Sequence, residues 1–160
     1  MTVHNTDWIV PRAQGYDTNR SLREEIIGGL ENVMFNPYVA GNAEFKPLES
    51  DFASKLGMKY AVAVQSATAG LILALRACDV GPGDEVITVG NSDISTTAAI
   101  SIIGATIVLV DILESDYTID GSQVASAVTD RTKAILPVDL YGHPSDCIAL
   151  RKVADEYGLK

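Results

Sequence analysis

Apolar positions in the first third of the chain recur at helical spacing. Between Arg20 and Met34, leucine, isoleucine and valine return every three or four residues, which predicts an amphipathic helix. A second helix is predicted over 46–56, because Pro47 falls in its first turn and Gly57 just past its end. Residues 1–18 show no sustained period and are interpreted as an arm. The pattern therefore predicts an arm with a first helix over 1–35, and a larger domain over 36–160.

Beyond residue 57 the period changes, and short apolar runs alternate with helical segments of about ten residues. Strands are predicted over 60–64, 85–89, 106–110 and 132–138, and helices over 67–78, 94–103, 120–128 and 144–157. This alternation is typical of an α/β domain with a mostly parallel sheet and flanking helices. The strand segments are continuously apolar, so both faces of each strand are expected to be covered.

The last predicted helix ends shortly before Lys160. An α/β chain is expected to enter its next strand at this point. The sequence therefore has the pattern of an incomplete domain.

Composition and charge narrow the class of protein. The chain has 160 residues, of which 47% are hydrophobic and 21% charged, and this suits one globular domain. The formal net charge of -9 argues against binding to nucleic acid or to an anionic membrane surface, although a local phosphate site stays compatible with it. No apolar stretch approaches the roughly 18 residues of a membrane span, and no signal peptide is recognisable. A cytoplasmic protein is expected.

The two cysteines, Cys78 and Cys147, fall in predicted helices and lack a CxxC spacing. They are expected to be small buried thiols in a reducing compartment, and no metal site is expected.

The turn between the first predicted strand and its helix is the main candidate for a binding site. It reads Gln65-Ser66-Ala67-Thr68-Ala69-Gly70. In open α/β sheets, ligands bind beyond the carboxyl ends of strands, and a helix N-terminus there offers free N–H groups to an anion. The hydroxyls of Ser66 and Thr68 could add donors, or either residue could simply cap the helix. The turn is neither a P-loop nor a GxGxxG motif.

Several segments resemble, in order and spacing, the DegT/StrS family of sugar aminotransferases. They are Lys59-Tyr60-Ala61-Val62-Ala63-Val64, Ser66-Ala67-Thr68-Ala69-Gly70, Gly81-Pro82-Gly83-Asp84-Glu85-Val86-Ile87-Thr88, Gly104-Ala105-Thr106, Thr132-Lys133-Ala134-Ile135-Leu136-Pro137-Val138 and Leu140-Tyr141-Gly142-His143-Pro144. The resemblance implies the N-terminal portion of a type I aminotransferase fold, with a partial large domain that binds pyridoxal phosphate. It further implies a nucleotide-linked keto sugar as substrate, glutamate or glutamine as amino donor, and a homodimer. By resemblance, the positions of Thr68 and Ala69 hold the cofactor phosphate, and Ser66 and Asp93 are further candidates for cofactor binding.

Two positions depart from the family pattern. Asp93 falls where the family commonly has an aromatic residue against the cofactor ring. Its carboxylate could accept a hydrogen bond from a ligand, or it could cap the helix that begins at Ile94. Asp139 stands where a histidine is common, at the end of a strand. It is a candidate substrate residue, or a solvated strand-end residue.

The resemblance also implies a lysine that forms a Schiff base with the cofactor and an acidic partner for its ring nitrogen. Both are expected downstream of this sequence. The lysines present fall on predicted helices, at strand starts or at the terminus: Lys46, Lys55, Lys59, Lys133, Lys152 and Lys160. No catalytic residue is therefore assigned within the chain. Three other functions stay open: a truncated or split non-catalytic binding or assembly module, a dehydratase of the same family, and an unrelated phosphate-binding domain.

Overall fold

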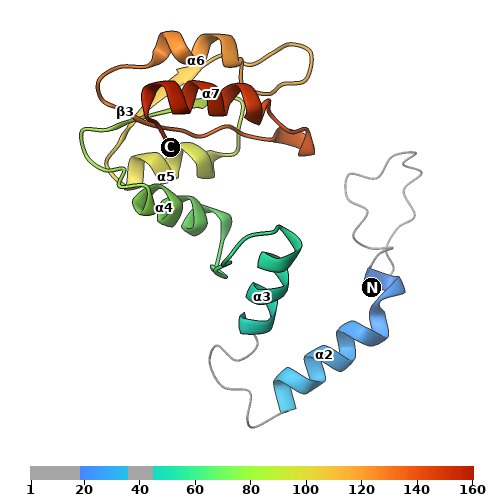
Figure 1. The fold of residues 1–160 in the computed structure, drawn as a ribbon. Coiled ribbons are helices and arrows are strands. Elements are labelled where there is room, and N and C mark those ends of the chain that lie inside the picture. Colours follow the sequence, from blue (N-terminus) through green and yellow to red (C-terminus); the bar gives the residue numbers. More distant parts are fainter. Residues whose placement is uncertain (1–18, 36–44) are drawn as a thin grey trace. The chain divides into compact units, whose positions relative to one another are not determined.

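The computed structural model describes residues 19–35 and 45–160, so the expected arm over 1–18 lies outside the described residues. The chain divides after Ala63 into two compact units (Figure 1). This division places the second helix in the same unit as the first, whereas the sequence pattern divides the chain after residue 35. Within the described ranges, no helix is long and apolar enough to cross a membrane.

The first unit contains helices α2 (Arg23–Phe35) and α3 (Phe45–Lys55), close to the predicted helices. Their large apolar residues are exposed: Leu22 just before α2, Ile26, Leu30 and Val33 along α2, and Leu48 and Phe52 on α3. The apolar face of an amphipathic helix normally packs against another surface, and this contact stabilises the helix. Within this unit, the Ala63 N–H donates to Glu49 Oε1 at 2.7 Å.

The second unit is an α/β fold, as predicted from the alternating pattern. Its elements are α4 (Ala67–Ala77), β1 (Glu85–Val89), α5 (Ile94–Ile102), β2 (Thr106–Val110), α6 (Gly121–Ala127), β3 (Thr132–Ile135), the 3-10 turn η2 (Leu140–Gly142) and α7 (Cys147–Tyr157). The three strands form a parallel sheet in the order β2-β1-β3. Successive parallel strands need a crossover, and α5 and α6 provide the two crossovers.

Helices cover both faces of this sheet (Figure 1). On one side, α4 and α5 form a core with β1 that includes Leu75, Val86 and Ile100. On the other side, α6 and α7 pack over Ile87 and Val89. All five residues of β1 are buried, including the polar residues Glu85 and Thr88, so both faces of this strand are covered.

Three expectations are wrong, and each error has a physical reason. The segment 60–64 is not a strand and its side chains are mostly exposed, because none of the three strands in the described residues pairs with it. β2 lies at the edge of the sheet, so Leu109 is 58% exposed rather than covered. Cys147 is exposed because it begins α7, and only Cys78 is half-buried, just after α4; both thiols are free.

β3 is shorter than predicted and ends at Ile135. Pro137 has no N–H group and cannot continue a strand ladder as a donor. Pairing with β1 still reaches one residue past the strand, since the Leu136 N–H donates to Ile87 O at 2.8 Å.

A buried carboxylate joins β1 to the start of β3. Glu85 accepts hydrogen bonds at 2.5 Å from the Thr129 hydroxyl and at 2.9 and 2.6 Å from two nitrogens of Arg131. These interactions, led by the bond from Thr129, lower the pKa of Glu85 below its usual value. A group with a lowered folded-state pKa stabilises the fold above its unfolded pKa of about 4.3, and that stabilisation is lost as the pH falls through the folded value.

We therefore expect Glu85→Gln to destabilise the protein at pH 7. The difference in stability between wild type and variant should shrink progressively as the pH falls below about 4.3. The urea midpoints of wild type and variant are measured from about pH 3 to about pH 7, a range that spans this pKa. Glu156→Gln, on the exposed side of α7, is the matched control and should show a small difference throughout. A gap between wild type and Glu85→Gln that stays constant with pH would contradict the prediction.

Candidate functional site

The sequence of elements places several loops at one edge of the sheet. α4 leads into the start of β1 through a short turn, and α5 begins just after β1 ends. Both helices therefore run opposite to the strands, and their N-termini lie at the carboxyl edge (Figure 1). The loop from β3 to α7 leaves from the same edge because the strands are parallel. The predicted site residues on the second unit thus meet at the edge where α/β proteins bind ligands.

At the N-terminus of α4, Ser66 is the N-cap. Its hydroxyl oxygen accepts the Ala69 N–H at 3.1 Å, and its carbonyl accepts the Gly70 N–H at 3.0 Å. The N–H groups of Ala67 and Thr68 have no acceptor in the described part of the chain. Free donors, small side chains and the positive end of the helix dipole at one point fit a phosphate group.

The structure gives Ser66, Thr68 and Ala69 different positions in this turn. Ser66 is exposed, whereas Thr68 and Ala69 are half-buried. Because the Ala69 N–H is already bound by Ser66, the N–H groups of Ala67 and Thr68 and the Thr68 hydroxyl are donors that a ligand could still use.

At the N-terminus of α5, Asp93 is the cap. Its carboxylate accepts the Ser95 N–H at 2.9 Å, and hydrogen bonding to the side chain and backbone of Ser95 lowers the pKa of Asp93. The Ser92 and Thr96 hydroxyls are hydrogen-bonded to each other at 2.7 Å. The polar side chains here are therefore engaged within the helix start. Ile94, an apolar residue at the start of α5, is 80% exposed, which the helical pattern of the sequence does not predict.

After β3, Asp139 closes a loop through hydrogen bonds and is not simply a solvated strand-end residue. Its Oδ1 atom accepts both the N–H and the hydroxyl of Ser145, each at 2.9 Å. Ser145 is buried, whereas Asp139 is exposed. Between them, Tyr141 has a left-handed backbone and an exposed ring. Neither Ser145 nor Tyr141 is a site candidate from sequence, although Gly142 signals a turn.

A hollow at this edge has Asp116, Asp120, Asp146 and His143 in its lining, together with apolar and hydroxyl side chains. Its carboxylates already accept hydrogen bonds from neighbouring backbone N–H groups. Asp120 and Asp146 cap α6 and α7, and Asp116 accepts the Thr118 N–H at 3.0 Å. Hydrogen bonds from Thr118, helped by the charge of His143, lower the pKa of Asp116. Among the described residues, no group of three or more histidine, cysteine or carboxylate side chains is placed to hold a metal ion.

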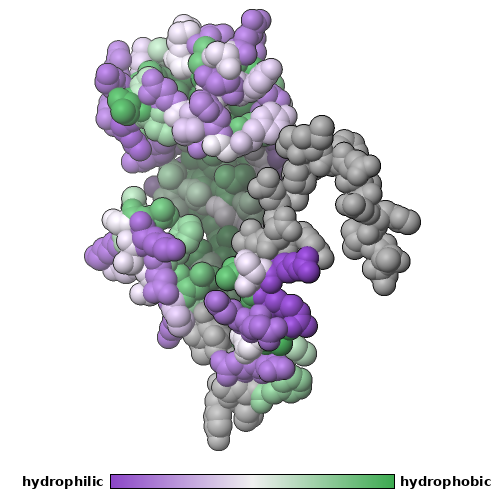
Figure 2. All heavy atoms as spheres, turned by 90° about the vertical axis from the view of Figure 1, so that its right-hand side faces the viewer, coloured by the Kyte–Doolittle hydropathy of each residue, from purple (hydrophilic) through white to green (hydrophobic). Residues whose placement is uncertain are grey.

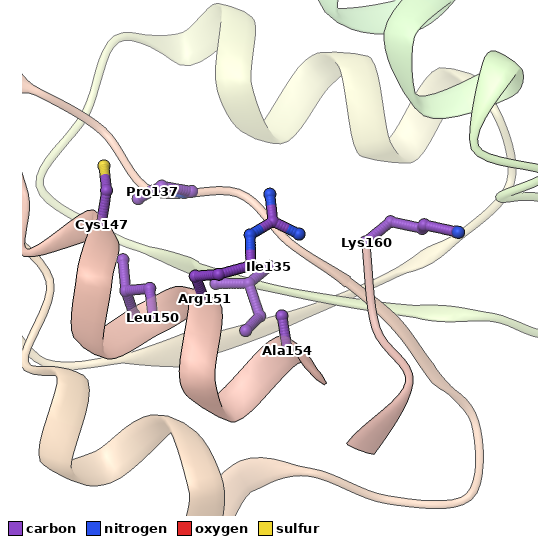
Figure 3. Close-up of a pocket in the computed structure, with 7 residues that line it drawn as sticks. All are labelled: Ile135, Pro137, Cys147, Leu150, Arg151, Ala154 and Lys160. Carbon is purple, nitrogen blue, oxygen red and sulfur yellow. The ribbon is translucent and has the colours of Figure 1, made fainter. Parts of the chain in front are cut away.

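A second hollow, of about 120 Å³, lies along the outer edge of β3 between Ile135 and α7 (Figure 3). Lys160 joins this edge: its N–H donates to Lys133 O at 3.0 Å, and its carbonyl accepts the Ile135 N–H at 2.8 Å. The lining is mostly apolar, and none of the predicted site residues contributes to it. This hollow is separate from the candidate site.

Among the lysines of the second unit, Lys133 is near the start of β3 and Lys152 is within α7, so neither lies at the carboxyl edge. The first unit carries Lys46 and Lys55 on α3, and Lys59 after that helix. Lys160 pairs beside Lys133. Figure 2, which looks onto the carboxyl edge of the second unit, shows polar side chains over the α6 and α7 level and apolar ones toward α4.

Comparison with known proteins agrees with the fold and with the resemblance seen in the sequence. DesV of S. venezuelae, solved in complex with a ketimine intermediate, is 40% identical over 94% of this chain, with a TM-score of 0.87. NtdA of Bacillus subtilis, with bound cofactor PMP, is 31% identical over 94% of the chain, with a TM-score of 0.74. Spr1654 of Streptococcus pneumoniae, in its PLP form, is 32% identical over 84% of the chain, with a TM-score of 0.76.

The chain spans 40%, 33% and 34% of the lengths of these three structures. The sequence model of the DegT/DnrJ/EryC1/StrS aminotransferase family matches residues 20–160. This match covers most of the chain and confirms the resemblance drawn from the motifs. The chain belongs to the DegT/DnrJ/EryC1/StrS aminotransferase family.

Proposed function

We propose that this chain works as the N-terminal part of a pyridoxal phosphate-dependent aminotransferase. The proposed substrate is a nucleotide-linked keto sugar, and the proposed amino donor is glutamate or glutamine. The observation that carries the proposal is the N-terminus of α4, where free N–H groups lie at the carboxyl edge of a parallel sheet. Family membership and the cofactor-bound relatives support the same ligand.

The cofactor would be held mainly by the first turn of α4. The Thr68 hydroxyl and N–H would donate to the phosphate, and the positive end of the α4 dipole would favour its charge. Ser66, as the N-cap, would hold the backbone of this turn in place by accepting the Ala69 N–H. Pyridoxal phosphate, when bound, supplies the electron sink for amino-group transfer.

The ring and the substrate would lie toward the ends of β1 and β3. Asp93 accepts its hydrogen bonds from Ser95 and would contribute by holding the α5 N-terminus next to the ring. Asp139 binds Ser145 through Oδ1, and we propose that its other oxygen faces the substrate. We further propose that neither the Schiff-base lysine nor the acid that pairs with the ring nitrogen belongs to the second unit described here, because its lysines lie near the start of β3, within α7 and beside Lys133.

We also propose a homodimer in the cytoplasm. α4 is apolar around much of its circumference, and Leu73 on its outer side is exposed, so this helix would gain from a covering partner. The two free thiols suit a reducing compartment.

The test is Thr68→Val, with pyridoxamine phosphate as the probe because its amine cannot form an imine with surface lysines. The change removes one hydrogen bond to a charged phosphate while keeping the side-chain shape, so the Kd should rise about tenfold. Fluorescence of the bound probe provides the measurement. Thr97→Val, the same change on α5, is the control and should leave the Kd within about twofold. Equal affinities for wild type and Thr68→Val would mean that Thr68 serves the helix alone.

A further inference from the structure

Tyr141 occupies a backbone position that its side chain disfavours. Tyr141 and Gly142 have φ values of 59° and 81°, and the His143 N–H donates to Leu140 O at 3.3 Å. Two central residues with positive φ define a type I′ turn, which strongly prefers asparagine, aspartate or glycine. Glycine at 142 fits this preference, whereas a bulky aromatic residue at 141 is an outlier.

Packing does not explain the tyrosine. Its side chain is 86% exposed, so the ring contributes little to either core of the unit. The second left-handed tyrosine of the unit differs in this respect: Tyr117 is less exposed, and its N–H closes a tight turn onto Leu113 O at 2.9 Å. An exposed ring on a strained backbone indicates that the ring serves a contact outside the unit itself.

The loop that carries Tyr141 is fixed at both ends. Asp139 Oδ1 holds the N–H and hydroxyl of buried Ser145, so the turn between them is closed by two hydrogen bonds. The loop follows β3, whose neighbour in the sheet is β1, the strand that leads to the α5 N-terminus. The ring of Tyr141 is therefore presented at the carboxyl edge, near the end of the strand beside the proposed cofactor pocket.

We propose that Tyr141 contacts the sugar ring of the nucleotide-linked substrate, an inference that rests on the proposed function. An aromatic face packs against the C–H surface of a hexose, and the phenol can exchange hydrogen bonds with its hydroxyls. Asp139 and Asp146 flank the same loop, and their negative charge disfavours a diphosphate there. A neutral sugar ring is the part of such a substrate that fits this position.

The experiment measures the affinity of the 160-residue chain, in the presence of pyridoxamine phosphate, for UDP-glucose and for UDP by NMR titration. Tyr141→Gly removes the ring and relieves the positive φ, whereas Tyr141→Phe keeps the aromatic face. Tyr117→Gly is the matched control, because it relieves the same kind of backbone at a second tyrosine. Urea midpoints are measured for each variant.

We expect Tyr141→Gly to weaken UDP-glucose binding about fivefold, with UDP binding changed less than about twofold. Its urea midpoint should be equal to or above that of wild type, since glycine adopts this backbone without strain. Tyr141→Phe should bind UDP-glucose within about twofold of wild type, and Tyr117→Gly should not change binding.

Unchanged UDP-glucose affinity in Tyr141→Gly overturns the inference, as does an equal loss for UDP and UDP-glucose. A fall in the urea midpoint of Tyr141→Gly, or absence of UDP-glucose binding to wild type, overturns it too. If Thr68→Val weakens pyridoxamine phosphate binding while Tyr141→Gly changes nothing, the inference alone fails. If pyridoxamine phosphate does not bind the wild-type chain at all, the proposed function fails with it.

Discussion

Replacing Ile100 with alanine should lower the free energy of unfolding by about 2 to 5 kcal/mol. Ile100 is 0% exposed, on the side of α5 that packs against Leu75 of α4 and Val86 of β1. The truncation removes apolar area from the core and leaves a cavity between two helices and the sheet. Urea unfolding followed by circular dichroism provides the free energy.

The matched control for this change is Ile102→Ala on the same helix. Ile102 is 63% exposed, so the same truncation should alter the free energy of unfolding by less than about 0.5 kcal/mol. Both variants carry the same isoleucine-to-alanine truncation on one helix, so most of the difference between their free energies of unfolding reports burial. If the two variants were equally stable, α5 would not be packed on the sheet as described.

Gly104→Ala should destabilise the protein by about 1 to 3 kcal/mol, for two separable reasons. The backbone of Gly104 has φ +83°, a conformation that alanine disfavours. A Cβ atom at this position would also lie 3.0 Å from Cγ of Pro82, closer than ordinary van der Waals contact. Thermal or urea unfolding of the variant measures the combined effect.

Gly83→Ala separates the two terms. Gly83 has φ +93°, but a Cβ atom there would meet nothing within 4 Å, so only the backbone term applies. The loss in Gly104→Ala should therefore exceed the loss in Gly83→Ala. Equal losses would show that the turn around Pro82 moves aside freely.

The elements of the second unit could be predicted from sequence because their signals are local. The turn over 81–84 separates α4 from β1, and Val86, Ile87 and Val89 of β1 reflect burial on both faces. The segment 60–64 is apolar throughout, yet it forms no strand. The local pattern indicates a tendency to be extended. A strand also needs a neighbouring strand to accept its N–H groups, and the local pattern does not show whether such a neighbour is present.

Of the candidate site, only the residues that cap helices could be predicted from sequence. Ser66 and Asp93 both cap helices, an alternative that the sequence supported for each. The bond between Asp139 and Ser145 joins residues across a loop, and the sign of φ at Tyr141 follows from how that loop closes. Neither is encoded in a periodic pattern. Ile94 was overlooked because its exposure depends on the direction in which α5 leaves the sheet.

The order of the strands has a consequence for folding during synthesis. β1 is the central strand, yet both of its neighbours follow it in the chain, and Glu85 meets Thr132 across 47 residues. As the chain leaves the ribosome, β1 can pair first only with β2, and its other edge stays open until β3 emerges. Pairing over such a separation is slow because the intervening chain must be ordered first. The nascent protein therefore leaves one edge of β1 unpaired until β3 emerges, and the contact of Glu85 with Arg131, which weakens in acid, forms only then.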